Sequence, residues 1–227
     1  MTYADHFKSW ATVLIAILAA ILLSVAAFTT GAGAQEQPPC SGKVVLDPGH
    51  GGTDSGAVNK NGLQEKVQTL EVAKRLQTLL MTDGCTVYMT RITDKTLSNN
   101  DRYTYANSTG ADVLVSVHMN GSTNTSADYT TTLFGKWRKD KELANTIFNS
   151  LSTLPAAVGT GKISTKTPYS FASGVLLKST MPATIAETVF ITNDKEAQLL
   201  SDSSGTRQQQ IAEALKVGIE DYLTPPR

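Results

Sequence analysis

Two histidines of this sequence are candidates for catalysis or metal binding, because each follows an apolar run that predicts a β-strand. His50 follows a short β-branched run and an Asp-Pro-Gly turn, and His118 ends the apolar run of residues 112–117. The chain has 3 histidines, and the remaining one, His6, belongs to the N-terminal segment. Ligands of open α/β sheets bind beyond the carboxyl ends of the strands. We therefore expect both imidazoles at the same edge of one sheet.

Carboxylates accompany these histidines. Glu187 stands within the apolar run 185–191, where a charge is costly without a partner. Glu65 begins a predicted helix whose amino end faces the same edge of the sheet. Spacing alone does not favour Glu65 over Glu71 or Asp54 as the carboxylate of this site. A carboxylate in the first turn of a helix also has a structural role, because it stabilises the helix dipole. Two imidazoles, one carboxylate ligand and a second carboxylate for proton transfer suit one catalytic zinc ion per chain. Either histidine alone would more often be structural, and the pair favours a metal.

The predicted elements that position these groups alternate along the chain between apolar runs typical of strands and the three- to four-residue apolar spacing typical of helices. We expect strands at 43–46, 86–90, 112–117, 129–134, 174–178 and 184–189, and helices at 65–82, 100–108, 141–154 and 206–222. Strands separated by helices predict a single α/β domain, with a mostly parallel, twisted sheet of about six strands and helices on both faces. The strand at 129–134 could be antiparallel or lie at an edge of the sheet.

Composition excludes several other classes of protein. The chain has 227 residues, with 20 Lys and Arg against 20 Asp and Glu, and 41% of its residues are hydrophobic. This apolar content argues against disorder, and zero net charge argues against sequence-independent binding of nucleic acid. With only 2 cysteines, the chain is not a disulfide-scaffold miniprotein. Zero net charge also argues against general electrostatic adhesion to an anionic cell wall or membrane, so the protein would need a specific site to bind either of them.

The N-terminal segment predicts export. Residues 11–28 form a nearly uninterrupted apolar run, and Ala32 and Ala34 match the small-residue pattern of a signal-peptidase site. The expected organisation is a signal peptide over 1–34, a linker over 35–42 and a catalytic domain over 43–224. The alternative is an uncleaved anchor, because the apolar run approaches the roughly 18–20 residues that span a bilayer. We expect a periplasmic or extracellular, cell-wall location.

Cys40 and Cys85 each lie just before a predicted strand. In a parallel sheet both cysteines would lie at the amino edge, opposite the two histidines, so they are poor candidates for metal ligands. In an exported protein we expect them to form a disulfide.

A series of motifs resembles the zinc-dependent N-acetylmuramoyl-L-alanine amidases. These cell-wall hydrolases cut the lactyl amide between N-acetylmuramic acid and the L-alanine of the stem peptide. The motifs are VVLDPGHGGTDSGAV, GLQEK, DRYTYAN, ADVLVSVHMN and PATIAETVFITNDKEAQLL, and the resemblance covers residues 43–222. It implies that His50, Glu65 and His118 hold zinc and that Glu187 is the catalytic glutamate, which removes the ambiguity over Glu65. One departure is the segment Thr188-Val189-Phe190, where the family usually has a glycine before the aromatic residue.

The resemblance implies peptidoglycan as the partner and metal-assisted amide hydrolysis, with Glu187 acting first as general base and then as general acid. Weaker candidates for orienting an imidazole or the substrate are Asp47, Asn120 and Arg102. Asp47 could hold an imidazole N–H or form a turn before Pro48. The alternative functions are a zinc peptidase or other metallo-amidase, or a wall-binding module without turnover. We expect a monomer without a separate wall-binding domain.

Overall fold

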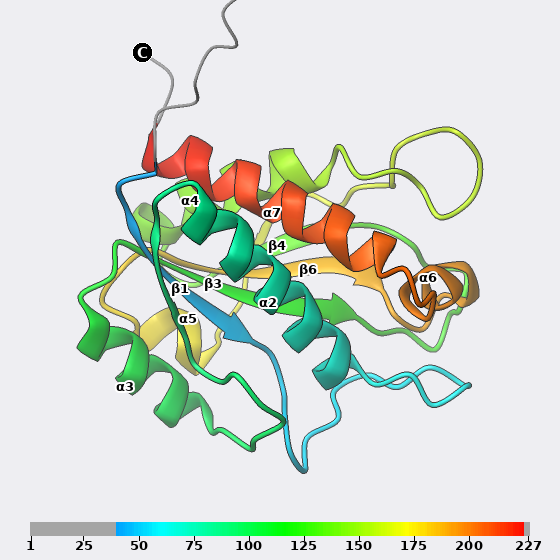
Figure 1. Cartoon of the computed structure of the whole chain (residues 1–227), viewed down its shortest axis with the longest axis horizontal. Coiled ribbons are helices and arrows are strands. Elements are labelled where there is room, and N and C mark those ends of the chain that lie inside the picture. Colours follow the sequence, from blue (N-terminus) through cyan, green and yellow to red (C-terminus); the bar gives the residue numbers. More distant parts are fainter. Residues whose placement is uncertain (1–39, 225–227) are drawn as a thin grey trace, which may run out of the picture. The chain divides into compact units, whose positions relative to one another are not determined.

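The computed structural model describes residues 40–224, and a six-stranded sheet runs through the middle of this part of the chain (Figure 1). In sheet order the strands are β2 (Thr86–Met89), β1 (Lys43–Pro48), β3 (Val113–Asn120), β6 (Ala183–Phe190), β4 (Thr131–Phe134) and β5 (Tyr169–Ser170). All neighbouring strands are parallel except β4 and β6, which are antiparallel. The predicted mostly parallel sheet is confirmed.

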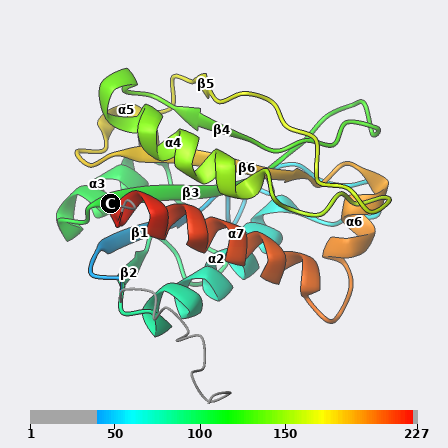
Figure 2. The ribbon, with the colours of Figure 1, turned by 90° about the horizontal axis from the view of Figure 1, so that it is seen from above.

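Helices cover both faces of the sheet (Figures 1 and 2). One layer contains α2 (Glu65–Thr82), α4 (Trp137–Leu151) and α7 (Thr206–Leu223), and the opposite layer contains α3 (Asn99–Thr109) and α5 (Gly174–Lys178). The short helix α6 (Asp194–Leu200) follows β6 and contacts α7. The predicted single α/β domain is therefore confirmed for residues 40–224.

The apolar stripe of α2 explains why this helix forms where the spacing predicts. Leu70, Ala73, Leu76 and Leu80 recur at three- and four-residue steps, and all four are buried against the sheet. The helix ends before Gly84, whose φ of 94° lies in the left-handed region that favours glycine. The resulting β1–α2 unit sets the amino end of the helix, and hence Glu65, at the carboxyl end of β1.

Three local predictions differ from the structure. Residues 174–178 form α5 instead of a strand, because a five-residue apolar run carries too little periodicity to separate the two states. The sixth strand is β5, whose two residues leave no pattern to detect. Helix α6 was not predicted, although Asn193 caps it by accepting hydrogen bonds from the backbone N–H groups of Lys195 and Glu196.

The predicted signal peptide over 1–34, and most of the predicted linker, lie outside the described residues. Within residues 40–224, no helix combines the length and apolar character needed to cross a bilayer.

Cys40 and Cys85 form a disulfide at the amino ends of β1 and β2, with their Cα atoms 4.8 Å apart. The bond closes a loop with a sequence separation of 45 residues. Replacing both cysteines by serine should lower the free energy of unfolding by about 4 kcal/mol, the chain-entropy value for a loop of this length. Urea unfolding of the oxidised protein and the double variant measures this difference. A change below about 1 kcal/mol would contradict the stabilising role.

Candidate active site

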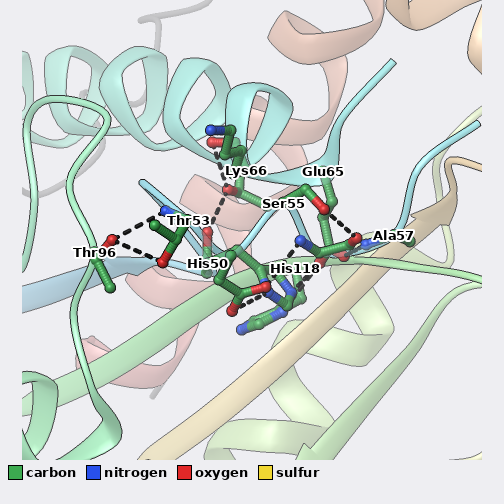
Figure 3. A network of polar contacts seen from close by, with 12 residues as sticks. His50, Thr53, Ser55, Ala57, Glu65, Lys66, Thr96 and His118 are labelled. Carbon is green, nitrogen blue, oxygen red and sulfur yellow. Dashed lines mark hydrogen bonds and ion pairs between the residues drawn. The ribbon is translucent and has the colours of Figure 1, made fainter. Parts of the chain in front are cut away.

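Two imidazoles and one carboxylate from three segments meet at the carboxyl end of the sheet (Figure 3). Glu65 Oε1 lies 3.1 Å from His50 Nε2 and 3.1 Å from His118 Nδ1. The three prospective ligand atoms all lie within 4.8 Å of one another. The structure therefore brings together the three residues that the sequence predicts as a ligand set. His118 lies within β3, because this strand continues beyond its predicted end.

A left-handed turn after β1 aims the imidazole of His50. Among the described residues, His50 is the only non-glycine residue with a positive φ, at 60°, and Gly51 and Gly52 follow with φ values of 129° and 60°. Such a backbone conformation is costly for a residue with a Cβ and persists only where its surroundings hold it. The turn must therefore be held by the groups packed beneath it.

Two buried guanidinium groups provide that support. Arg102 donates to the carbonyl oxygens of Pro48 and His50, both at 2.8 Å. Arg91 donates to the carbonyl oxygens of Pro48 at 2.9 Å and Gly49 at 2.8 Å. Arg102 was a candidate from the sequence, whereas Arg91 was missed. The position of Arg91 shortly after β2 could have identified it, because parallel strands bring their carboxyl ends to the same edge of the sheet.

Asp47 belongs to this supporting network. Its carboxylate is buried and accepts hydrogen bonds from Arg102, Thr90 and Ser116 at 2.6–2.7 Å. Burial acts to raise the pKa of Asp47, but the charge of Arg102 and these hydrogen bonds lower it below its usual value. Asp47 thus anchors Arg102, and the hydrogen-bond partners that the described residues give its carboxylate include no imidazole.

The carboxylate that does hold His50 is Asp54. Asp54 Oδ2 lies 2.9 Å from His50 Nδ1, which leaves Nε2 of the same ring facing Glu65. The loop that carries Asp54 is tied to α2, because the ammonium group of Lys66 donates to the carbonyl oxygen of Gly52 at 2.7 Å. A carboxylate behind a histidine fixes the ring orientation and tautomer that a metal ligand needs.

Backbone hydrogen bonds fix the orientation of the Glu65 carboxylate. Its Oε1 accepts from the backbone N–H of Met119 and its Oε2 from that of Ala57, both at 2.9 Å. Two glycines leave room for the cluster: a Cβ at Gly49 would overlap the His118 ring, and one at Gly56 would come within 2.6 Å of Glu65 Oε2. The close approach of the three ligands therefore depends on the absence of side chains at these positions.

The electrostatics of the cluster favour a bound cation. Burial acts to lower the pKa of His50, but the hydrogen bond and charge of Glu65, followed by those of Asp54, raise it to about 9. Burial acts to raise the pKa of Glu65, but hydrogen bonds from His118 and His50 lower it. A metal cation can take the place of the protons that these groups share. Two imidazole nitrogens and one carboxylate oxygen fit a catalytic zinc ion, whereas magnesium and calcium prefer oxygen ligands.

Glu187 lies beside this cluster and is not part of it. It stands in β6, directly opposite His118 of the parallel neighbour β3. Burial raises the pKa of Glu187, the charge of His118 acts against that rise, and the charge of Glu65 adds to it. Asn120 ends β3 beside Phe190, and within the described part of the chain its buried side-chain nitrogen has no hydrogen-bond partner. All the site residues predicted from the sequence therefore lie in or around one region.

Replacing Asp54 by asparagine should weaken zinc binding by about 10- to 100-fold, because His50 loses the carboxylate that orients its ring. Competition with a chromophoric chelator measures the affinity. Glu71→Gln is the matched control, since this half-buried carboxylate of α2 lies outside the cluster and, within the described residues, pairs only with Lys74, at 3.8 Å. Equal zinc affinities for the Asp54 variant and the wild type would show that Asp54 does not orient the ligand.

Comparison with known proteins identifies the family. A family model described as N-acetylmuramoyl-L-alanine amidase matches residues 44–221. The amidase AmiA of Salmonella typhimurium is 31% identical, over 79% of this chain and 75% of that protein. An amidase structure from Clostridium difficile has a TM-score of 0.74 and 32% identity, over 83% of this chain and all of that one.

The catalytic domain of the amidase CwlV from Bacillus (Paenibacillus) polymyxa has a TM-score of 0.72 and 29% identity, over 80% of this chain and 98% of that one. The match of the family model spans most of the chain, and the fold agrees with two solved amidase structures. The chain belongs to the N-acetylmuramoyl-L-alanine amidase family of hydrolases.

Proposed function

We propose that this protein is a zinc-dependent hydrolase that cuts the amide between N-acetylmuramic acid and the L-alanine of peptidoglycan stem peptides. One observation carries the proposal: His50, Glu65 and His118 converge within 4.8 Å, with Glu187 opposite His118 on the neighbouring strand. Family membership supports the choice of substrate, because the matched relatives are named for this reaction.

The three clustered residues would hold the metal through His50 Nε2, His118 Nδ1 and a carboxylate oxygen of Glu65. A zinc ion bound there would polarise the scissile carbonyl and lower the pKa of water to about 7. The protein's own contribution is to hold these ligands at the carboxyl end of the sheet. Asp54, Met119 and Ala57 fix their orientation through hydrogen bonds.

Glu187 would move the proton. Its carboxylate takes a proton from the attacking water as the new C–O bond forms, and then returns that proton to the nitrogen of the leaving alanine as the amide C–N bond breaks. Its place outside the ligand cluster suits this role, because a carboxylate that moves protons must be free of the metal. Asn120 and Arg102 have different positions: Asn120 is available to orient substrate, whereas Arg102 supports the turn that carries His50.

A pair of soluble substrates tests the proposed reaction. One is an N-acetylmuramoyl peptide, and the other is the same peptide with an acetyl group in place of the sugar. We expect hydrolysis of the first, with products of the mass of N-acetylmuramic acid and of a peptide that begins with free L-alanine. Equal cleavage of the second substrate would identify a general metallo-peptidase. Zinc binding without cleavage of either would identify a binding module.

We also propose that the protein is exported and that residues 1–34 are removed. The Cys40–Cys85 disulfide supports this, because structural disulfides persist in oxidising compartments. N-terminal sequencing of the protein from the host's envelope or medium should find Gln35 as the first residue. Recovery of residues 1–34 in the membrane fraction would identify an anchor instead.

A further inference from the structure

The strands next to Glu187 extend the candidate site toward the β5 edge of the sheet. Thr131 of β4 is the antiparallel partner of Glu187. Beyond β4, the backbone N–H of Lys166 donates to the carbonyl oxygen of Thr130 at 3.0 Å. Two strand spacings, about 10 Å, therefore separate the backbones at Glu187 and Lys166.

Aromatic residues mark the same face of the sheet. Residues opposite each other in an antiparallel pair point to one face, and residues two apart in a strand do so as well. Tyr129 lies two residues before Thr131, just outside β4, and the bridge between Thr130 and Thr165 continues the alternation, so Tyr129 shares the face of Thr131 and Glu187. Its ring packs edge to face on Phe190 of β6, with ring centroids 4.6 Å apart. This contact places Tyr129 just beyond Glu187 on the side of the sheet that carries the reaction.

Lys166 reaches over two tyrosine rings on this face. Its Nζ lies 4.9 Å from the ring centroid of Tyr169 and 5.7 Å from that of Tyr129. Burial raises the pKa of Tyr169, while the charge of Lys166 lowers it and the charge of Glu187 adds to the rise. Cation–π contacts hold the ammonium group above the rings.

The charge of Lys166 is left without an acidic partner among the described residues, in contrast to five other lysines. The lysines paired with carboxylates are Lys60, Lys66, Lys74, Lys136 and Lys216. The aromatic rings hold the Lys166 ammonium group without neutralising it, and both Lys166 and Tyr169 are exposed. An ammonium group oriented in this way beside a reaction centre is suited to bind an anionic part of the substrate.

We propose that Lys166, Tyr129 and Tyr169 form a subsite for a carboxylate of the stem peptide, on the peptide side of the scissile amide. The subsite rests on the proposed function. The lactyl carboxyl group of muramic acid is consumed in the scissile amide, so the negative charges near the cut lie on the peptide. A carboxylate on the residue after L-alanine lies about two Cα spacings, roughly 7 Å, from the scissile nitrogen. This distance is shorter than the about 10 Å that separates the backbones at Lys166 and Glu187, and the long side chains of both residues can close the difference. The tyrosine rings would cover the aliphatic part of the peptide.

Two muramoyl peptides test the subsite: in one, the residue after L-alanine carries a free carboxylate, and in the other this group is a neutral amide. For the wild type, kcat/KM should be at least about tenfold higher with the free carboxylate, as expected for a hydrogen bond between charged groups. Lys166→Met should bring the ratio near one, mainly through a higher KM for the charged peptide. Lys162→Met, which changes an exposed lysine nearby in the sequence, should keep the wild-type ratio.

The outcomes separate the subsite from the proposed function. Cleavage of both peptides by the wild type with a ratio near one would overturn the subsite and leave the amidase activity intact. An unchanged ratio in Lys166→Met would overturn it as well. If the wild type cleaves neither peptide, the proposed function fails and the subsite fails with it.

Discussion

Replacing Glu187 by glutamine should lower kcat for muramoyl-peptide hydrolysis by about 10³-fold, the usual contribution of a positioned acid–base group. Glutamine preserves the size of the side chain but cannot take a proton from water or return one to the leaving nitrogen. Zinc should stay at one per chain, because Glu187 stands outside the cluster of His50, Glu65 and His118. Turnover of a soluble substrate and atomic absorption on the same preparation measure the two quantities.

The matched control is Glu142→Gln, which changes an exposed glutamate of α4. This variant should retain wild-type kcat. If Glu187→Gln kept activity within tenfold of the wild type, another group would have to move the proton. If the variant lost its zinc, Glu187 would belong among the ligands.

Replacing His118 by alanine should remove both zinc and turnover. The variant loses one of three protein ligands, and Glu65 loses one of the two imidazoles that it contacts. We expect a fall in kcat/KM of at least about 10³-fold, since the polarised carbonyl and the activated water are both lost. Dialysis against zinc followed by metal analysis, together with an activity assay, measures the effect.

A folding control accompanies this variant, because Gly49 packs against the His118 ring and the substitution leaves a space there. Far-UV circular dichroism should match that of the wild type, since His118 is only half-buried near the carboxyl end of β3 and does not belong to the apolar core. Full zinc occupancy with normal turnover in His118→Ala would show that the metal is held elsewhere.

The fold was largely predictable because its longer elements carry strong periodicity. The stripe of Leu70, Ala73, Leu76 and Leu80 predicts α2 with the bounds that the structure shows. The same reasoning fails for residues 174–178, where five residues without a side-chain N-cap are equally compatible with a strand and a helix. Tertiary packing, here the contact of α5 with α3, decides such a segment.

The candidate site was predictable in part. Strand ends brought His50 and His118 to one edge, but Asp54, Glu65 and Glu71 could not be ranked by spacing. The loop before α2 decides among them: it turns Asp54 behind His50, and the helix start presents Glu65 to both imidazoles. Such a loop path depends on hydrogen bonds between residues that are distant in sequence.

The support beneath the site was the hardest feature to predict. Arg91 contacts carbonyl oxygens 42 and 43 residues away in the chain. Its position after β2 indicates the edge of the sheet on which it lies, but not the groups that it contacts. The same applies to Gly49 and Gly56, whose missing side chains matter only because ligands from other segments pack against them.

Digestion of purified peptidoglycan tests the central claim most directly. The enzyme would be assayed as purified, after removal of metal by a chelator, and after restoration with zinc. Mass spectrometry would identify the soluble products. We predict free stem peptides that begin with L-alanine, and glycan strands with free lactyl carboxylates, lost on chelation and regained with zinc. Peptidoglycan left intact by the zinc-loaded enzyme, or the same products after complete removal of metal, would contradict the account.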